Sequence, residues 1–403
     1  MTASVATVRL WEFCVTYDTI ISMEQGAAKK PTIGIVGGGQ LGRMLTQAAL
    51  PLGFSVVVVD PSQNCPAHQV GAAEITGNLY DQAALHELAK RSDVITVEIE
   101  HLDTLVLEAL EKEGAVIHPA PATVRLIQDK YLQKVFLREH SVPVADFTEV
   151  NSTQDAEKAL KAFDDKMLLK TRHGAYDGRG NMVVSSPADI KKAFELFDGK
   201  ALYAEAFVPF ERELAVMVGR STSGDVQAYP VVQTIHQRNI CVEVLSPAPV
   251  SKTVAQKTHT LAVTVANLLK GAGMYGIEMF LTPSGEVLVN EIAPRVHNSG
   301  HHTIEGNRTS QFEQHIRAIT DLPLGGTSLT APATVMVNIL GERNGETQVK
   351  GLGDALAIPD VHVHLYGKSP TKIDRKMGHL TATADTLEAA RRNARAARKA
   401  LDI

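Results

Sequence analysis

The sequence is poor in cysteine and carries no excess of basic residues. Its 403 residues include three cysteines, Cys14, Cys65 and Cys241. An odd and widely spaced set argues against a disulfide framework and for a reducing compartment, so we expect a cytoplasmic protein. The formal net charge of −5 offers no basic surface, which argues against nucleic acid as the main partner.

Long apolar runs are also missing. No stretch approaches the ~20 apolar residues that a membrane helix needs, so we expect no membrane-spanning segment. Residues 1–30 have neither the basic start nor the small-residue cleavage site that is typical of a signal peptide. We expect them to form a disordered N-terminal extension, or to reflect a translation start placed too early, with Met23 as the alternative start.

The composition, 44% hydrophobic and 21% charged, is typical of a soluble globular enzyme. A chain of this length is expected to form about two to four domains. Apolar strands over 32–36, 56–59 and 94–100 alternate with helical stretches. This alternation predicts a parallel sheet covered on both sides.

The rest of the chain predicts a different mixture of elements. A helix over about 123–139 leads into a small unit that ends near residue 207. A longer β-rich section then extends to about residue 322 and ends in a helix near 310–320. The tail contains alternating strands at 334–340 and 361–365 and a basic, alanine-rich helix from Thr386.

A hairpin carries the most informative pair of side chains. Residues 282–285, Thr-Pro-Ser-Gly, form a turn between two apolar runs. Folding there places Glu278 opposite Val289, which makes Glu278 and Glu291 diagonal neighbours roughly 7–8 Å apart at Cβ. With Asn290 beside them, these carboxylates can hold Mg²⁺ against a nucleotide polyphosphate. The alternative is a solvated sheet face that happens to carry two glutamates.

A first glycine loop, Gly-Gly-Gly-Gln-Leu-Gly at 37–42, lies between a strand and a helix, and Asp60 ends the next strand. This spacing matches the dinucleotide-binding fingerprint. Glycines bring backbone N–H groups close to a phosphate at a helix N-terminus. The pattern indicates phosphate affinity more firmly than NAD, because Gln40 and Arg43 suit a small phosphoester equally well. A purely structural turn is the remaining interpretation.

A second glycine loop, 174–180, follows a strand that ends in Lys170. Such a loop can close over nucleotide phosphates, with the lysine as a point charge. No Gly-Lys-Ser/Thr follows, so it is not a P-loop, and the alternative is an exposed hairpin turn. Farther on, the apolar stretch 204–208 with Glu205 and Glu213 could hold adenine and ribose, although most such stretches are core.

Residues 295–302, Arg-Val-His-Asn-Ser-Gly-His-His, come directly after the second carboxylate. Three histidines within six residues, with no thiolate nearby, make a poor zinc site. Arginine, histidine, asparagine and serine beside a metal–phosphate centre better suit a small oxyanion. Glu243 is interpreted as a solvated charge.

Three elements thus follow one another: a Lys-tipped glycine loop, an acidic hinge and a carboxylate pair. This order resembles the ATP-grasp fold, and the chain is most similar to the N5-carboxyaminoimidazole ribonucleotide synthetase family of bacterial and fungal purine synthesis. The resemblance covers about residues 31–385. The stretches that carry it are 39–44, 174–180, 290–300, 310–313, 317–323, Lys368 and 375–380.

The resemblance implies an α/β architecture: an ATP-grasp fold with an N-terminal parallel-sheet (Rossmann-like) domain, a small lid domain and a C-terminal mixed α+β domain. After the extension, 1–30, the expected domains are a substrate-phosphate domain at 31–130, a lid at 131–206, a catalytic domain at 207–325 and a C-terminal domain at 326–403.

The resemblance also implies the site. Residues expected around ATP are Lys130, Lys170, Ala175, Tyr176, Asp177, Gly178, Arg179, Gly180, Asn181, Glu205, Ala206, Phe207, Val208, Glu213, His236, Asn290 and Glu291. Mg²⁺ would be held by Glu278 and Glu291. Residues expected around aminoimidazole ribonucleotide are Gln40, Leu41, Tyr176, Asp177, Lys368 and Arg375. The expected catalytic residues are Arg179, Arg295, His297, Asn298 and Ser299, the last four around bicarbonate. Two departures from the family pattern are Ala175, where many relatives have glycine, and the apolar pair Ala206 and Phe207 in the hinge.

The activity that the resemblance implies is ATP- and bicarbonate-dependent carboxylation of 5-aminoimidazole ribonucleotide through carboxyphosphate. Relatives of this kind are usually homodimers. No mutase segment follows in the sequence, so we expect a separate protein to take the product. Alternatives are a formate-dependent purine transformylase, a biotin-dependent carboxylase subunit, an NAD-linked oxidoreductase built on the first glycine loop, and a non-catalytic binding protein.

Overall fold

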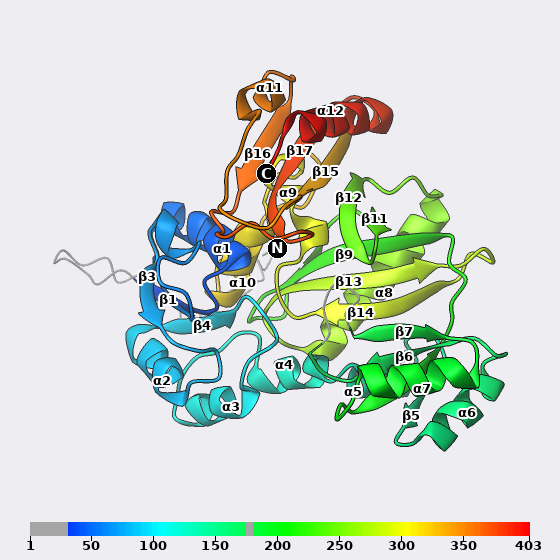
Figure 1. Cartoon of the computed structure of the whole chain (residues 1–403). Coiled ribbons are helices and arrows are strands. Elements are labelled where there is room, and N and C mark those ends of the chain that lie inside the picture. The colour runs from blue at the N-terminus through cyan, green and yellow to red at the C-terminus, as the bar shows by residue number, and fades with distance from the viewer. Residues whose placement is uncertain (1–30, 175–179) are drawn as a thin grey trace, which may run out of the picture.

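The computed structural model describes residues 31–174 and 180–403, which fold around three β-sheets (Figure 1). The predicted N-terminal extension lies outside the described residues. Cys65 and Cys241 are buried and form no disulfide within the described residues, and Cys14 falls outside the description. Within the described ranges, no helix has the length and hydropathy needed to cross a bilayer.

The N-terminal sheet is parallel, as the sequence predicts. Its strand order is β3-β2-β1-β4. The strands are β1 (Thr32–Val36), β2 (Ser55–Asp60), β3 (Ala73–Thr76) and β4 (Val94–Val97), and the helices are α1 (Gln40–Ala49), α2 (Gln82–Arg91) and α3 (Thr104–Lys112). Because side chains alternate along a strand, Ile33 and Ile35 pack in the same core as α1, whereas Val36 packs in the core that contains α2 and α3.

The predicted single helix over 123–139 is wrong, because two helices occupy this stretch. They are α4 (Pro121–Gln128) and α5 (Lys130–Glu139). Between them, Asp129 leaves the helical conformation, with φ −89° and ψ 100°, and its carboxylate accepts bonds from Tyr131 N and Leu132 N. An aspartate in that conformation satisfies the free N–H groups of a new helix and starts it.

A small antiparallel sheet follows, with strand order β5-β8-β6-β7. Its strands are β5 (Phe147–Val150), β6 (Met167–Thr171), β7 (Asn181–Val184) and β8 (Leu202–Ala206), and its helices are α6 (Thr153–Ala162) and α7 (Pro187–Leu196). These helices and strands share one hydrophobic core. The unit lies at the lower right of Figure 1, against the edge of the large sheet.

The third sheet is antiparallel and runs β14-β13-β9-β11-β12-β15-β17-β16, with β10 paired to β9. The strands are β9 (Arg212–Arg220), β10 (Val226–Ala228), β11 (Val232–Gln237), β12 (Ile240–Ser246), β13 (Gly273–Leu281), β14 (Val287–Ala293), β15 (Ala333–Leu340), β16 (Val361–Leu365) and β17 (Lys376–Ala384). Because β12 pairs with β15, the sheet continues across the expected boundary between residues 325 and 326.

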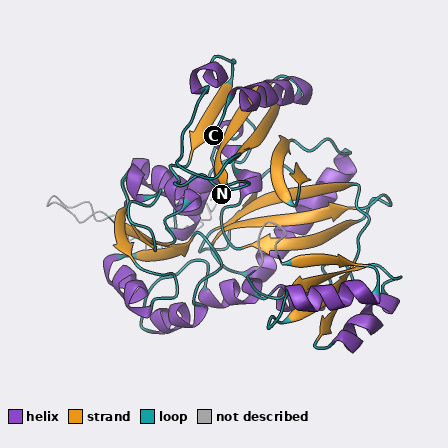
Figure 2. Ribbon diagram, viewed as in Figure 1, coloured by secondary structure: helices purple, strands orange, loops and turns teal. Residues whose placement is uncertain are grey.

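Helices cover this sheet in two places (Figure 2). The long α8 (Lys252–Leu269) packs against β9, β13 and β14, and it was not predicted from the sequence. Helix α10 (Gln311–Ile319) packs against β9 and β13. At the C-terminal end, α11 (Leu352–Leu356) and α12 (Leu387–Ala400) share a core with β15 and β17.

The predicted register of the hairpin is also wrong. Leu281 pairs with Val287, and the register shifts before Glu278, which pairs directly with Glu291. The turn is longer than expected, since Thr282 N donates to Glu286 O at 2.9 Å, and Asn290 is the extra residue of a β-bulge. Glu278 and Glu291 are therefore direct cross-strand neighbours rather than diagonal ones, which brings their carboxylates closer than the sequence predicts.

Candidate functional site

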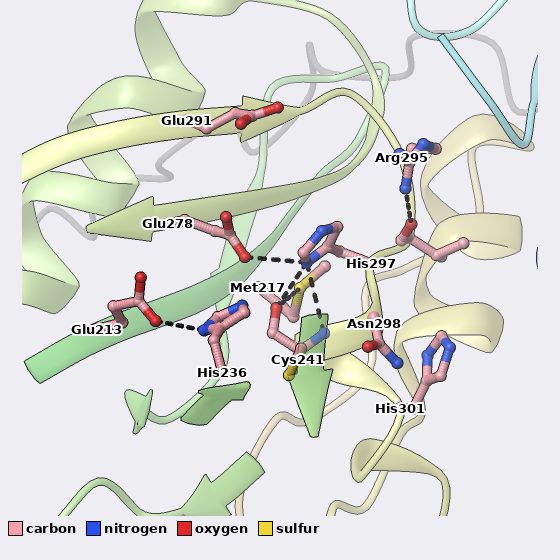
Figure 3. A network of polar contacts seen from close by, with 12 residues as sticks. Glu213, Met217, His236, Cys241, Glu278, Glu291, Arg295, His297, Asn298 and His301 are labelled. Carbon is pink, nitrogen blue, oxygen red and sulfur yellow. Dashed lines mark hydrogen bonds and ion pairs between the residues drawn. The ribbon is translucent and has the colours of Figure 1, made fainter. Parts of the chain in front are cut away.

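The carboxylates of the predicted metal pair lie on one face of the large sheet. Figure 3 shows Glu291, Glu278 and Glu213 on the successive strands β14, β13 and β9. The register agrees: Glu278 pairs with Glu291 and with Ala215, two residues from Glu213 along β9. Alternation along the strand therefore gives Glu213 and Glu278 the same face.

Charge repulsion is built into this pair. Burial first, and then the neighbouring Glu291, raise the pKa of Glu278 to about 7. Among the described residues, no group of three or more His, Cys, Asp or Glu side chains is placed to hold a metal. Two carboxylates nevertheless suit Mg²⁺, which usually takes one or two protein carboxylates and completes its shell with water and phosphate oxygens.

Lys130, at the start of α5, lies against the second carboxylate. Its Nζ donates to Glu291 Oε1 at 2.8 Å. Burial alone would lower the pKa of Lys130, but the carboxylate raises it above its usual value. The lysine is therefore a cation beside the carboxylate pair, where it could bind an ATP phosphate in place of Glu291.

A second charged cluster lies deeper, at the small sheet. Glu205 on β8 is only 1% exposed and accepts from Lys170 Nζ at 2.8 Å. Lys134 Nζ lies 3.0 Å from its other oxygen and also donates to Val289 O at 3.2 Å. Burial would raise the pKa of Glu205, but the two lysines hold it at about 2. The Glu205 side chain thus fixes two cations.

The hinge itself is half-buried. Ala206 N donates to Asp146 O at 2.8 Å, and Lys166 Nζ lies 3.7 Å from the centre of the Phe207 ring. Val208 follows, also half-buried. The apolar side chains noted in the sequence therefore pack beside the small sheet, and the lysine stacked on Phe207 helps to hold the aromatic ring.

Glu213 and His236 form a contacting pair on β9 and β11, through Glu213 Oε2 and His236 Nδ1. Burial would lower the pKa of His236, but the carboxylate raises it. Both residues were expected beside the nucleotide, and the structure brings them together next to Glu278 (Figure 3).

The loop 295–302 closes the other side of the carboxylate pair. Arg295 forms two bonds to Glu100, Nε to Oε2 at 2.6 Å and Nη2 to Oε1 at 3.0 Å. His297 Nδ1 lies 2.9 Å from Ser299 Oγ and 3.8 Å from Glu278 Oε1. Burial first, and then Arg295, lower the pKa of His297 to about 3, so the imidazole is neutral near pH 7.

Asn298 points away from this group. Its side-chain amide pairs with that of Asn338 on β15. His297 and Ser299 thus contact each other beside Glu278, with Arg295 close by (Figure 3), whereas the Asn298 amide is engaged by Asn338 on β15. An oxyanion site formed by this group stays a prediction.

Residues expected at the substrate phosphate come from opposite ends of the chain. Lys368 Nζ contacts Gln40 Oε1 and donates to Lys376 O at 3.1 Å. Arg375 Nη1 donates to Pro370 O at 2.7 Å. Leu41 packs in the hydrophobic core with its side chain buried, so only its backbone is available to a ligand.

The first glycine loop holds an internal anion. Gly39 N donates to Glu98 Oε1 at 2.7 Å, Gly42 N donates to Glu98 Oε2, and Gly38 N donates to Asp60 Oδ2 at 3.0 Å. These backbone donors are the ones that a dinucleotide pyrophosphate would use. The arrangement therefore argues against the NAD-linked alternative.

Several predicted residues fall in the segment that is not described. Ala175, Tyr176, Asp177, Gly178 and Arg179 lie outside the described residues. At the end of that loop, Gly180 O accepts from Thr171 N at 2.8 Å, and Asn181 pairs with Lys170 across the β6–β7 ladder. The two ends of this segment therefore lie on neighbouring strands, with Lys170 on β6 opposite Asn181 on β7.

Four polar residues of the site were missed. Glu98 and Glu100 were assigned to a strand that in fact ends at Val97. Their position could have been recognised, because ligands of parallel sheets bind beyond the carboxyl ends of the strands. Lys134 lies four residues after Lys130 on one helix face, which was also readable. Asn338 had no local signal, since its partner lies 40 residues away.

Three protein families match the chain. The ribonucleotide synthetase preATP-grasp domain matches residues 30–128, the ATP-grasp domain matches 135–312, and the phosphoribosylaminoimidazole carboxylase C-terminal domain matches 334–393.

Curated relatives agree. The phosphoribosylaminoimidazole carboxylase of Ogataea methanolica is 46% identical over 366 residues, covering 88% of this chain and 67% of that protein. The phosphoribosylaminoimidazole carboxylase of Schizosaccharomyces pombe is 44% identical, and the match covers 89% of this chain and 66% of that protein. The chain thus spans about two thirds of the length of these fungal proteins. The N5-carboxyaminoimidazole ribonucleotide synthase of Bacillus subtilis is 39% identical, covering 87% of this chain and 90% of that protein.

Solved structures agree as well. The N5-carboxyaminoimidazole ribonucleotide synthetase of Thermotoga maritima superposes with a TM-score of 0.84 at 42% identity, covering 92% of this chain and 99% of that one. The Aspergillus clavatus enzyme, in complex with ADP and 5-aminoimidazole ribonucleotide, gives 0.86 at 38% identity, covering 92% and 98%. The chain therefore belongs to the N5-carboxyaminoimidazole ribonucleotide synthetase family, with an ATP-grasp fold.

Proposed function

We propose that the chain carboxylates 5-aminoimidazole ribonucleotide to N5-carboxyaminoimidazole ribonucleotide, using ATP and bicarbonate, in purine biosynthesis. One observation carries the proposal most directly. Glu278 and Glu291 pair directly across β13 and β14, next to a bulge, and His297 Nδ1 lies 3.8 Å from Glu278 Oε1. A site for metal-bound phosphate thus adjoins a site for a small oxyanion, as transfer of a phosphoryl group to bicarbonate requires.

The first half-reaction would join bicarbonate to phosphate. A bicarbonate oxygen attacks the γ-phosphorus of ATP, the bond to the β-phosphate oxygen breaks, and ADP leaves carboxyphosphate behind. Mg²⁺, when held by Glu278 and Glu291, would offset the negative charge that builds up during the transfer. Lys130 and Lys170 add positive charge for the phosphate oxygens. This chemistry depends on positioning and electrostatics rather than on a protein nucleophile.

The second half-reaction would transfer the carbon. Carboxyphosphate separates into CO₂ and phosphate, and the exocyclic amine of the ribonucleotide attacks CO₂ and loses a proton to give the carbamate. His297, neutral near pH 7, serves here as a hydrogen-bonding group rather than as a cation. Enclosure of the site would limit the loss of carboxyphosphate to water. Lys368 and Gln40, which contact each other, would hold the substrate phosphate, with Arg375 nearby.

Other parts of the proposal rest on the family alone. Tyr176, Asp177 and Arg179 remain predicted contacts of the ribonucleotide. The expected domain limits, the homodimer, the cytoplasmic location and a separate mutase for the next step also stay predictions. Sedimentation of the purified chain would test the homodimer.

A steady-state assay with ATP, bicarbonate and aminoimidazole ribonucleotide, each omitted in turn, tests the function. We expect ADP release to depend on bicarbonate and to be stimulated by the ribonucleotide, with carbamate as product. Stimulation by formate or biotin in place of bicarbonate would refute the substrate assignment and leave the ATP-grasp scaffold. A thermal shift with NADH but not with ATP and Mg²⁺ would favour the oxidoreductase.

A further inference from the structure

Asn298 and Asn338 form a closed pair of amides. Asn298 Nδ2 donates to Asn338 Oδ1 at 3.0 Å, and Asn338 Nδ2 donates to Asn298 Oδ1 at 2.6 Å. Asn338 Nδ2 also donates to Cys241 O at 2.8 Å, and both asparagines are buried. Each amide thus gives its partner both a donor and an acceptor. Asn298 could reach a bound anion only by breaking both bonds.

The pair fixes the turn that carries the reactive side chains. Asn298 opens the short helix η3 (Asn298–Gly300) and lies between His297 and Ser299. Those neighbours contact each other at 2.9 Å, and His297 faces Glu278. Figure 3 shows the Asn298 side chain directed away from the carboxylate pair while His297 is directed toward it. Holding Asn298 therefore orients its two neighbours.

The backbone of the same turn has a separate clamp. Gln311 on α10 accepts from His297 N at 2.9 Å through Oε1 and donates to His297 O at 2.8 Å through Nε2. A Cβ at Gly300 would lie 2.4 Å from Gln311 Oε1. Gln311 Nε2 also lies 3.0 Å from His301 Nδ1, so α10 holds the chain both before and after Asn298. The Asn298 side chain, which lies between these contacts, is held by Asn338.

Asn338 also links this turn to the predicted phosphate site. It pairs with His379 across the β15–β17 ladder, and β17 begins at Lys376, whose carbonyl accepts from Lys368 Nζ. The strands that carry the contacts of Lys368 therefore also carry the partner of Asn298. The same part of the sheet thus contacts both Lys368, which is expected at the substrate phosphate, and the 297–299 turn.

We propose that Asn338 is a positioning residue which, through Asn298, holds the 297–299 turn in the orientation that passes the one-carbon unit from phosphate to the ribonucleotide amine. The proposal rests on the proposed function. Without Asn338 the turn loses its orientation, so ATP is still cleaved but carboxyphosphate escapes to water. The expected defect is therefore one of coupling, not only of rate.

The test compares four purified variants: Asn338→Leu, Asn298→Leu, the double variant, and Asn307→Leu as control. Asn307 is another buried asparagine, which donates to Thr327 O at 2.8 Å and lies outside the site. ADP and carboxylated ribonucleotide are measured together at saturating substrates. We expect Asn338→Leu to release about tenfold more ADP per product than the unaltered chain, and Asn307→Leu to keep the original ratio.

The double variant separates positioning from general damage. If the amides act as a unit, it should show the ratio of either single variant rather than the product of the two defects. Its melting temperature should lie above that of Asn338→Leu, because no orphaned amide remains. An unchanged ADP-to-product ratio in Asn338→Leu, whatever the rate, would overturn the proposal. Failure of the unaltered chain to carboxylate would instead refute the proposed function.

Discussion

Glu278 and Glu291 repel each other, and Lys130 donates a hydrogen bond to only one of them. The bond from Lys130 Nζ reaches Glu291, whereas burial and Glu291 leave Glu278 with a pKa of about 7. A divalent cation bound between the two carboxylates would replace this repulsion by attraction. The close pairing of two half-buried carboxylates therefore favours a metal site over a solvated sheet face. Because such a cation would need both carboxylates, we expect loss of either one to weaken its binding.

The first prediction concerns the variant Glu291→Gln. It removes a charged oxygen ligand, so we expect ATP cleavage to fall by at least about 100-fold and the Mg²⁺ concentration for half-activity to rise, since metal charge stabilisation is worth several kcal/mol. Titration of the ATPase rate with Mg²⁺ measures both. Glu286→Gln, an exposed substitution in the adjoining turn, is the control. An unchanged Mg²⁺ dependence in Glu291→Gln would remove the metal assignment.

The second prediction concerns Lys134, whose side chain is 2% exposed and lies 3.0 Å from Glu205. Removing one partner of a buried ion pair typically costs 3–5 kcal/mol. Since Lys170 still neutralises Glu205, we expect Lys134→Met to lower the free energy of unfolding by about 2–3 kcal/mol. Urea unfolding measures it, with the exposed Lys158→Met as control, for which we expect less than about 1 kcal/mol. Equal effects would mean that the buried pair contributes nothing.

At the scale of elements, α5 delivers both lysines to their targets. Lys130 and Lys134 lie four residues apart, on one face of the helix, and reach Glu291 and Glu205. Asp129 caps this helix and so sets its start. Its carboxylate also accepts hydrogen bonds from Arg172, from Nε to Oδ1 at 3.1 Å and from Nη2 to Oδ2 at 2.5 Å. The positions of Lys130 and Lys134 therefore depend on one buried aspartate.

The third prediction follows for Asp129→Asn, which keeps a capping oxygen but loses the charge. We expect the helix to persist, because asparagine caps as well as aspartate. The substitution also weakens the charge-assisted bonds to Arg172, whose carbonyl accepts from Lys130 N at 2.9 Å. We expect the start of α5, and with it Lys130, to be held less firmly, so that the KM for ATP rises roughly 10-fold, about 1.5 kcal/mol, with kcat changed less. Asp103→Asn, at the cap of α3, is a matched control away from the nucleotide. If Asp103→Asn raised the KM for ATP as much as Asp129→Asn or more, the start of α5 would have no special role in ATP binding.

Local patterns predicted some of the elements, and the failures have local causes. The strands and helix around the first glycine loop were predicted because apolar periodicity and glycine spacing agree there. The helix α8 was missed because its sequence, KTVAQKTHTLAVTVANLL, is rich in Thr and Val, which favour strands. The hairpin was predicted, but its bulge at Asn290 leaves no mark in the local pattern.

At the scale of the whole molecule, the sequence could not predict partners that lie far apart along the chain. Glu243 was interpreted as a solvated charge, which is wrong, because it is buried and bound by Arg391 and Arg395 of α12, 148 and 152 residues later. The resemblance supplied the expected binding residues, but the pairing of Asn298 with Asn338 required the fold. Distant contacts depend on topology, which a single sequence does not encode in any short window.

Buried histidines join the parts of the molecule. His315 on α10 lies 2.7 Å from Thr96 Oγ1 on β4 and accepts from Met274 N on β13 at 3.0 Å. His301 lies beside His379, with ring centres 5.0 Å apart. Burial lowers the pKa of His315 to about 3 and holds the pKa values of His301 and His379 well below the usual range. These junctions therefore require neutral imidazoles.

The last prediction is a loss of stability in mild acid. In the unfolded chain these histidines take up protons below about pH 6.5, whereas in the folded chain they stay neutral, so the stability present above pH 6.5 is lost as pH falls. Each such histidine removes up to about 1.4 kcal/mol per pH unit. We expect the urea midpoint to fall steeply between pH 6.5 and 5, before most carboxylates titrate. His315→Gln should be less stable at pH 8 but show a shallower decline, whereas His140→Gln, at the exposed end of α5, should keep the original slope. A flat midpoint over this range would mean that the junctions tolerate charged imidazoles.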